Sequence, residues 1–145
     1  EVDAVRAAGE KMKEAGALKV VELNVSGPFH SSLLKPASEG LDKYVSDINF
    51  NDPDVPVVAN YTADIEKTAD EVKENLVKQV SGAVRWQDSI EKMVDEGIET
   101  FIEIGPGNVL KKMMRRINRK VTAININSVE SMEKALKKLD IDMNE

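Results

Sequence analysis

The residue with the clearest chemical potential is His30, because it is the only histidine in the sequence and an imidazole titrates near neutral pH. It follows an apolar segment that ends at Val25 and a Ser-Gly-Pro break at residues 26–28. Loops at the ends of strands are where α/β proteins usually carry functional groups. His30 is therefore a candidate general base or acid. A surface or structural role is commoner for a lone histidine, and the position alone leaves both roles open.

A histidine base needs a nucleophile, and the residues around His30 do not supply one. A serine in a G-x-S-x-G turn would be the usual partner in an α/β acyl-transfer fold, and this motif is absent from the sequence. Ser31 and Ser32 follow His30 directly, which is too close in sequence to suggest a triad. Either His30 is not catalytic or its serine lies elsewhere.

Two further patterns occur near residue 110. Gly-Pro-Gly at residues 105–107 could admit a phosphate to the start of the next helix, although a plain tight turn is the commoner meaning of such residues. The helix expected over residues 108–119 is amphipathic. Its apolar face, expected to pack on the sheet, comprises Val109, Leu110, Met113, Met114 and Ile117. Its cationic face comprises Lys111, Lys112, Arg115, Arg116 and Arg119. A solvated helix face or a docking surface would both explain these cations.

Periodicity predicts the elements that must position these residues. Apolar spacing of three and four indicates helices over residues 2–15, 34–48, 69–80, 86–94, 108–119 and 129–139. Strands are expected over residues 21–25, 55–59, 100–104 and 121–126. The strand over residues 21–25 alternates apolar and polar residues, which is typical of a half-buried antiparallel strand. Strands separated by helices predict an α/β fold with a mostly parallel sheet, and the change of pattern near residue 26 suggests a subdomain boundary.

The composition argues against several classes of protein. The chain has 145 residues, of which 41% are hydrophobic and 32% charged, as in a globular domain. Its net charge of −6 argues against broad nucleic-acid binding, which requires Lys and Arg to neutralise phosphates. The sequence has no apolar run long enough for a membrane span and no signal-peptide pattern at its start. Without cysteine and with one histidine, neither a disulfide framework nor a metal site is expected. We expect a cytoplasmic protein, and the start without Met suggests a fragment or a processed piece.

The segment around His30 is similar to one family. Residues 25–37, Val-Ser-Gly-Pro-Phe-His-Ser-Ser-Leu-Leu-Lys-Pro-Ala, resemble the histidine loop of malonyl-CoA:acyl carrier protein transacylases, the loading enzymes of type II fatty-acid synthesis. Further segments match in order and extend the resemblance over nearly the whole chain. These are residues 54–60, 76–80, 84–86 and 101–110.

The resemblance implies a fold and a reaction. The fold is a large α/β-hydrolase-like acyltransferase domain with an inserted ferredoxin-like subdomain. Residues 1–26 would form the end of the small subdomain, and residues 27–145 the C-terminal part of the large domain. The reaction is ping-pong: a serine takes malonyl from coenzyme A and passes it to the phosphopantetheine thiol of acyl carrier protein, in fatty-acid biosynthesis. Malonyl-CoA is then a substrate, and no permanently bound cofactor is expected.

The same resemblance implies roles for individual residues. His30 would be the general base and acid. The backbone carbonyl of Gln79 would replace the aspartate of a triad, keeping control of the tautomer but losing the charge that stabilises an imidazolium. Phe29 would crowd the α-carbon of the acyl group and select malonyl over methylmalonyl, with simple packing of the loop as the alternative. The cations of residues 111–119 would contribute to docking of the acidic carrier protein.

Three parts of the family's site are absent from this sequence: the G-x-S-x-G serine, the arginine that pairs with the malonyl carboxylate, and the glutamine of the oxyanion hole. We therefore expect the chain alone to be inactive and the missing N-terminal half, as a companion chain, to complete it. Two other interpretations stay open. One is an acyltransferase domain of a polyketide or multidomain fatty-acid synthase, and the other is a non-catalytic α/β module that binds an acidic partner.

Overall fold

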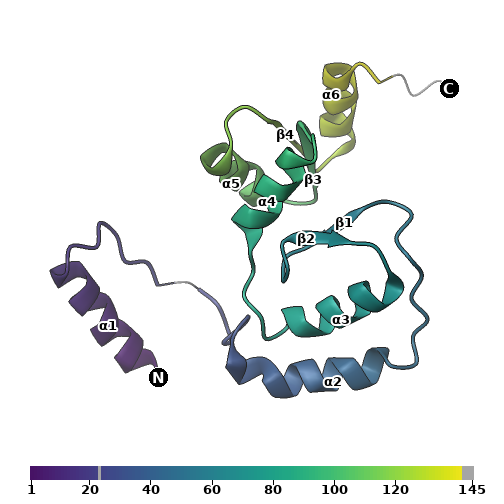
Figure 1. Cartoon of the computed structure of the whole chain (residues 1–145). Helices are drawn as coiled ribbons and strands as arrows, with labels where there is room; N and C mark the ends of the chain where they lie inside the picture. The colour runs from purple at the N-terminus through teal and green to yellow at the C-terminus, as the bar shows by residue number, and fades with distance from the viewer. Residues whose placement is uncertain (23, 142–145) are drawn as a thin grey trace.

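The computed structural model describes residues 1–22 and 24–141 (Figure 1). Within these ranges no helix is both long enough and apolar enough to cross a bilayer. The helices are α1 (Val2–Glu14), the short 3-10 helix η1 (Ser32–Leu34), α2 (Lys35–Val45), α3 (Ala69–Gln79), α4 (Trp86–Asp95), α5 (Val109–Ile117) and α6 (Val129–Leu139). The strands are β1 (Val57–Ala59), β2 (Asp64–Glu66), β3 (Thr100–Ile104) and β4 (Thr122–Ile126).

The first packed unit is built around α3. This helix lies between α2 and the antiparallel β1–β2 hairpin (Figure 1). It begins with a capping box, in which the Thr68 hydroxyl accepts from the Glu71 N–H and the Glu71 carboxylate accepts from the Thr68 N–H. Such a box satisfies two N–H groups that the first turn leaves unpaired. On the other side, the Ser38 hydroxyl of α2 donates to the Val77 carbonyl at 2.6 Å and ties α2 to α3.

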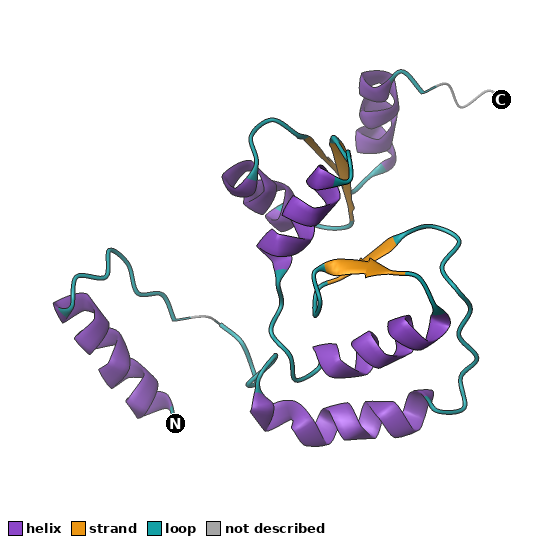
Figure 2. Cartoon of the chain, in the orientation of Figure 1, coloured by secondary structure: helices purple, strands orange, loops and turns teal. Residues whose placement is uncertain are grey.

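The second packed unit is a parallel strand pair with helices against it. Strands β3 and β4 run parallel in register from Thr100 opposite Thr122 to Ile104 opposite Ile126, and α5 is the crossover between them (Figure 2). Helices α5 and α6 contact β4, and α4 contacts α5. The buried apolar residues of this unit are Ile90, Met114, Ile124 and Ala135. A crossover helix between parallel strands is the unit expected of an α/β fold, so this class is confirmed.

The expected strand over residues 21–25 is wrong for the residues described. Residues 21, 22, 24 and 25 have no strand structure, and residue 23 lies outside the described residues. Residues 20–22 lie along α1: a Cβ added at Gly9 would be 3.1 Å from Val20 Cγ1, and Arg6 forms an ion pair with Glu22 at 3.6 Å. A strand needs a second strand to receive its backbone hydrogen bonds, and the described residues offer none beside it.

The remaining strands differ from expectation in one respect. The strands expected at 100–104 and 121–126 appear as β3 and β4. The one expected at 55–59 begins at Val57, after Pro56, and pairs with an unexpected partner, β2. Strand β2 has three residues, two of them acidic, so its sequence carries no apolar alternation that would predict it. One of the two sheets is therefore parallel and the other is an antiparallel hairpin.

The structure exposes more surface than a compact domain of its size. Its accessible area is 11451 Å², whereas the scaling law for compact monomers gives about 7,400 Å² for 16.0 kDa. Several large apolar side chains are exposed, and Ile104 of β3 is 82% exposed. Purely parallel sheets normally have both faces covered. The two-stranded β3–β4 sheet thus has an apolar surface that residues 1–22 and 24–141 do not cover.

Candidate active site around His30

His30 lies at the turn that leads into η1 and α2. Its φ of 58° places it in the left-handed region, which non-glycine residues seldom occupy and which costs on the order of 1–3 kcal/mol. The Ser31 hydroxyl donates to the Pro28 carbonyl at 2.7 Å and closes the loop. Backbone conformations of this kind concentrate at functional sites. The loop therefore holds the His30 backbone in a conformation that most non-glycine residues avoid.

The Gln79 carbonyl lies against the imidazole. The distance from His30 Nδ1 to the Gln79 backbone oxygen is 3.0 Å, although the residues are 49 positions apart. Gln79 is the last residue of α3, and the last carbonyls of a helix have no intrahelical partner. Its oxygen is therefore free to accept a hydrogen bond from Nδ1–H. This tautomer leaves the lone pair on Nε2, where a base would remove a proton.

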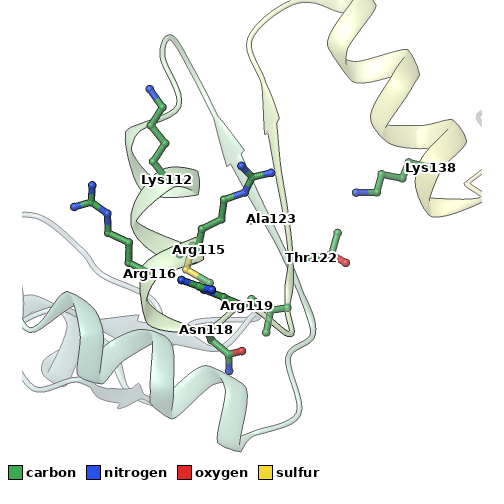
Figure 3. Close-up of a pocket in the computed structure, with 10 residues that line it drawn as sticks. Lys112, Arg115, Arg116, Asn118, Arg119, Thr122, Ala123 and Lys138 are labelled. Carbon is green, nitrogen blue, oxygen red and sulfur yellow. The ribbon is translucent and has the colours of Figure 1, made fainter.

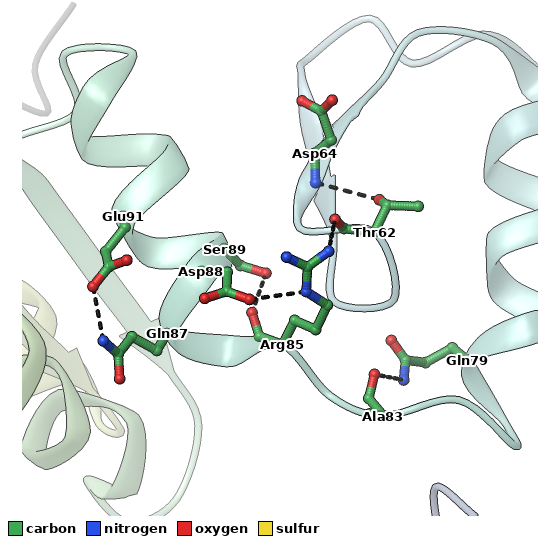
Figure 4. Close-up of polar contacts among 9 residues, drawn as sticks. All are labelled: Thr62, Asp64, Gln79, Ala83, Arg85, Gln87, Asp88, Ser89 and Glu91. Carbon is green, nitrogen blue, oxygen red and sulfur yellow. Dashed lines mark hydrogen bonds and ion pairs between the residues drawn. The ribbon is translucent and has the colours of Figure 1, made fainter.

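The Gln79 side chain stabilises the turn that follows α3. Its Nε2 donates to the Gly82 carbonyl at 3.2 Å. It also donates to the Ala83 carbonyl at 3.3 Å, the bond drawn in Figure 4. The Gln79 Nε2 also lies 3.4 Å from His30 Nδ1. With a proton on Nδ1 both nitrogens are donors, so no hydrogen bond forms between them. The backbone of Gln79 and its side chain thus act separately, one on the imidazole and one on the turn.

Arg85 connects this unit to α4. Its backbone N–H donates to the Asn60 carbonyl at 2.8 Å, and its guanidinium donates to the Thr62 carbonyl at 2.7 Å and to the Asp88 carboxylate at 2.8 Å (Figure 4). The Ser89 hydroxyl donates in turn to the Arg85 carbonyl at 2.8 Å. These bonds join the hairpin turn to the start of α4 and so couple the His30 unit to the β3–β4 unit.

A second polar link runs beside Arg85. Lys92 of α4 lies 2.9 Å from Glu96 and 3.4 Å from Asp64 of the hairpin. The hydrogen bond to Glu96 and the bond and charge of Asp64 raise the pKa of Lys92. The Ile65 N–H, followed by Lys92, lowers the pKa of Asp64. Asp64 is exposed and Lys92 only half-buried, so solvent screens this link and it is a minor contribution beside the Arg85 contacts.

Phe29 lies next to His30 and is 58% exposed. Its ring lies over Gly27, where an added Cβ would be 3.5 Å from the ring edge. The ring is thus not inserted into a core of this chain. Its predicted role in substrate selection stays a prediction.

The start of α5, which follows the Gly-Pro-Gly turn, is capped by the chain's own carboxylate. Glu103 of β3 accepts from the N–H groups of Leu110 and Lys111 at 3.0 and 3.2 Å. Gly105 and Gly107 have φ values of 136° and 86°, a conformation that glycine adopts without strain. Because Glu103 already occupies the start of α5, the tight-turn interpretation holds and the phosphate cradle is not supported.

The apolar face of α5 is only partly buried. Met114 is buried and Ile117 half-buried, but Val109 is 65% exposed, and Leu110 and Met113 are also exposed. The expectation that all five pack on the sheet is therefore wrong. Two strands are too narrow to cover the whole apolar face of a helix.

The five predicted cations do not share one environment. Lys112, Arg115, Arg116 and Arg119 line a hollow at the C-terminal end of α5, together with Lys138 of α6 (Figure 3). Lys111 is half-buried and lines a separate, apolar cleft with Trp86 and Ile90. Sequence reasoning missed Lys138, because nothing in the periodicity of α6 indicates that it faces α5.

An α/β chain with a loop histidine bonded to a helix-end carbonyl has the features of the base-bearing part of an acyl-transfer enzyme. The sequences of known acyl-transfer enzymes support this assignment. The chain is 42% identical over 135 residues to the malonyl CoA-acyl carrier protein transacylase of Bacillus subtilis (strain 168), covering 93% of this chain and 43% of the relative. No family model matches.

Solved structures agree in fold. The malonyl CoA-acyl carrier protein transacylase from Clostridium perfringens superposes with a TM-score of 0.88 at 39% identity, covering 94% of this chain and 43% of that one. A type II PKS acyl-carrier protein in complex with its malonyl-transacylase also matches, with a TM-score of 0.88 at 37% identity over 94% of this chain and 44% of that one.

The chain is therefore similar to the C-terminal part of malonyl CoA-acyl carrier protein transacylases, which confirms the resemblance expected from the sequence. It spans less than half the length of the relatives it matches.

Proposed function

We propose that this chain supplies the acid-base part of an enzyme that moves malonyl from coenzyme A to the phosphopantetheine thiol of acyl carrier protein in fatty-acid biosynthesis. The observation that carries the proposal is the 3.0 Å contact between His30 Nδ1 and the Gln79 carbonyl. The similarity to malonyl CoA-acyl carrier protein transacylases supports the choice of substrates. The test is malonyl transfer by this chain combined with a companion polypeptide that bears G-x-S-x-G.

In the proposed mechanism His30 moves one proton in each half-reaction. Its Nε2 takes the proton of the companion's serine as the serine oxygen attacks the thioester carbonyl of malonyl-CoA. The imidazolium then protonates the departing thiolate of coenzyme A. In the second half-reaction His30 takes the proton of the phosphopantetheine thiol, which attacks the acyl-serine, and returns a proton to the serine oxygen. The Gln79 carbonyl orients the ring throughout.

The proposed domain organisation follows the same similarity. We assign residues 1–26 to the end of a ferredoxin-like subdomain and residues 27–145 to the C-terminal part of an α/β-hydrolase-like domain. The companion is the N-terminal half of the same enzyme, and the uncovered β3–β4 surface supports its presence. We further propose a cytoplasmic enzyme with malonyl-CoA as substrate and no permanently bound cofactor.

Replacing Phe29 tests substrate selection. In the assembled enzyme we expect Phe29→Ser to raise the use of methylmalonyl-CoA relative to malonyl-CoA by about 5- to 150-fold, because a clash the size of one methyl group is worth about 1–3 kcal/mol. The measurement is the ratio of kcat/KM values for the two thioesters. An unchanged ratio would leave Phe29 as a residue that only packs the loop over Gly27.

The cations of α5 are assigned to the docking of acyl carrier protein. We expect Arg115→Glu combined with Arg116→Glu to raise the KM for carrier protein about tenfold or more and to flatten its salt dependence, because such charges act on association. Formation of the acyl-serine from malonyl-CoA should change much less. If the rates of both half-reactions fell equally, or if neither rate changed, these cations would be ordinary solvated residues with no role in docking.

A further inference from the structure

The last turn of α3 leaves one carbonyl weakly bonded by the backbone. The final carbonyls of a helix have no partner within it, so they depend on the residues around the helix end. The Lys78 carbonyl accepts from the Gly82 N–H at 2.9 Å, whereas the Val77 carbonyl accepts from the Val80 N–H at 3.3 Å. The second bond is longer than the usual length of about 2.9–3.0 Å. The Val77 carbonyl can therefore accept a second, stronger donor.

Ser38 of α2 supplies this donor. Its Oγ lies 2.6 Å from the Val77 carbonyl oxygen, and the residue is only 8% exposed. A serine inside a helix often donates to a carbonyl of its own helix, three or four residues earlier. Ser38 instead bonds across to α3, along which α2 packs (Figure 1). The hydroxyl thus satisfies the end of α3 and not its own helix.

The segment from His30 to Ser38 therefore holds the end of α3 at two points. His30 Nδ1 lies 3.0 Å from the Gln79 carbonyl oxygen, and Ser38 bonds to the Val77 carbonyl. These two carbonyls belong to the same helical turn, whose geometry is fixed, with a rise of about 1.5 Å per residue. A bond that fixes the Val77 carbonyl relative to α2 therefore also fixes the position of the Gln79 carbonyl.

Other polar contacts of α3 restrain different parts of it. Lys73 Nζ donates to the Ser46 carbonyl at 3.0 Å, but this exposed bond joins the end of α2 to the first half of α3. The Gln79 side chain bonds to the Gly82 and Ala83 carbonyls, so it restrains the turn that follows the helix. The Ser38 hydroxyl is the contact that ties the end of α3 to the helix that follows His30.

The bond between His30 and Gln79 needs such support because it is exposed, and water competes for both of its partners. A base acts within a heavy-atom reach of about 2.6–3.2 Å, and a misplacement of about 1 Å can lower a rate on the order of 10²-fold. If the Gln79 carbonyl moved away, the imidazole could carry its proton on Nε2. In that tautomer Nε2 cannot accept the proton of a serine. Holding the carbonyl in place therefore also holds the tautomer.

We propose that Ser38 is a positioning residue for the His30 base, and that its hydroxyl keeps the Gln79 carbonyl within reach of Nδ1. Ser38 acts only through this carbonyl and is assigned no contact with the reacting atoms. The proposal rests on the proposed function for the reaction in which His30 takes part. It assigns to α2 a second role beside packing, which is to align the acceptor with the imidazole that precedes the helix.

Ser38→Ala in the full 145-residue chain tests the proposal, because alanine keeps the helix and removes only the hydroxyl. Ser89→Ala is the matched control: Ser89 is 2% exposed, and its hydroxyl donates to the Arg85 carbonyl (Figure 4). The measurement is the ratio of the Nε2–H to the Nδ1–H tautomer of His30, from ¹⁵N chemical shifts. We expect Ser38→Ala to raise this ratio about three- to tenfold, the range for weakening one neutral hydrogen bond. Ser89→Ala should leave the ratio unchanged.

Activity of the assembled enzyme gives a second readout. Ser38→Ala should lower kcat for acyl-serine formation about three- to tenfold and change the KM for malonyl-CoA less than about twofold, because alignment of the base acts on the chemical step. Ser38→Cys replaces the hydroxyl with a weaker S–H donor of similar shape, and it should give an intermediate tautomer ratio. This variant carries the same comparison if Ser38→Ala does not fold.

Several outcomes would overturn the positioning role. One is a tautomer ratio that is the same in the Ser38 variants, in Ser89→Ala and in the unsubstituted chain. Another is a raised KM at constant kcat. A third is a Ser38 hydroxyl proton that exchanges with water as fast as a free hydroxyl in the unsubstituted chain, because the bond to Val77 would then be absent. The proposed function fails differently, by the absence of acyl-serine in an assembled enzyme whose His30 keeps the Nδ1–H tautomer.

Discussion

His30→Ala is expected to lower malonyl transfer by about 10²- to 10⁴-fold in an enzyme assembled from this chain and its proposed companion. Without the imidazole, no group at the Gln79 carbonyl can take the serine proton or return it to the thiolate. Both half-reactions should therefore fall together. The measurement is the rate of acyl-serine formation from labelled malonyl-CoA, followed by the rate of transfer to carrier protein.

Two controls separate a catalytic loss from a structural one. Circular dichroism and carrier-protein binding should be unchanged in His30→Ala, because His30 is exposed and makes one main-chain contact. Gln79→Ala keeps the backbone carbonyl but removes the side-chain bonds to Gly82 and Ala83. Its loss should be under about tenfold if the carbonyl is what orients the ring. Near-normal acyl-serine formation in His30→Ala would refute the assigned role.

The single histidine also allows the tautomer to be measured directly. In the unsubstituted chain, ¹⁵N chemical shifts of the neutral imidazole should report a proton on Nδ1, because the Gln79 carbonyl accepts from that nitrogen. No other histidine contributes to the signal. This reading does not depend on activity, so it tests the geometry separately from the reaction.

Helices could be predicted from the sequence because each carries its own signal. Helix α6 spans Val129–Leu139 as expected, and it begins with Ser128 bonded to Ser131 in a capping box. Helix α3 begins with the Thr68 and Glu71 box and ends within one residue of expectation. In both, local capping and a three- and four-residue apolar spacing agree, so no distant contact is needed to define the element.

The strands and the burial of individual side chains could not be predicted as well, because both depend on contacts between residues that are distant in the sequence. Residues 21–25 alternate as a strand does, yet they lack a neighbouring strand in the described structure. Strand β2 forms because β1 lies beside it, not because of its own composition. Likewise, Val109 belongs to an apolar helix face but stays exposed, because β3 and β4 together are too narrow to cover it.

Only part of the candidate site could be predicted from the sequence. His30 could be selected as the only imidazole, but its acceptor lies 49 residues away and is a backbone atom, which no side-chain pattern can reveal. The family resemblance supplied Gln79. Lys138 was missed because its helix lies next to α5 only in three dimensions. The spacing of residues along the sequence does not indicate which helices lie side by side in the fold.

The isolated chain is expected to show no malonyl transfer, and addition of the proposed N-terminal half should restore it. The chain lacks the nucleophilic serine, and it also exposes surface that a compact protein of its size would bury. The exposed area exceeds that of a compact 16.0 kDa protein by about 4,000 Å², which is larger than the roughly 1,000–2,500 Å² that one partner buries in many obligate interfaces. Ile104 and Val109 lie on this uncovered surface, and partner strands and side chains would cover them.

Restoration can be tested with a mutated companion as the control. The chain is mixed or co-expressed with an N-terminal half that carries G-x-S-x-G, and with a second version in which that serine is alanine. Both versions should form a complex with the chain and raise its melting temperature, because burial of apolar surface stabilises the folded state. Only the first should form acyl-serine and load carrier protein. Turnover by the verified chain alone, or a complex with the intact serine that stays inactive, would contradict the division of the catalytic residues between two polypeptides.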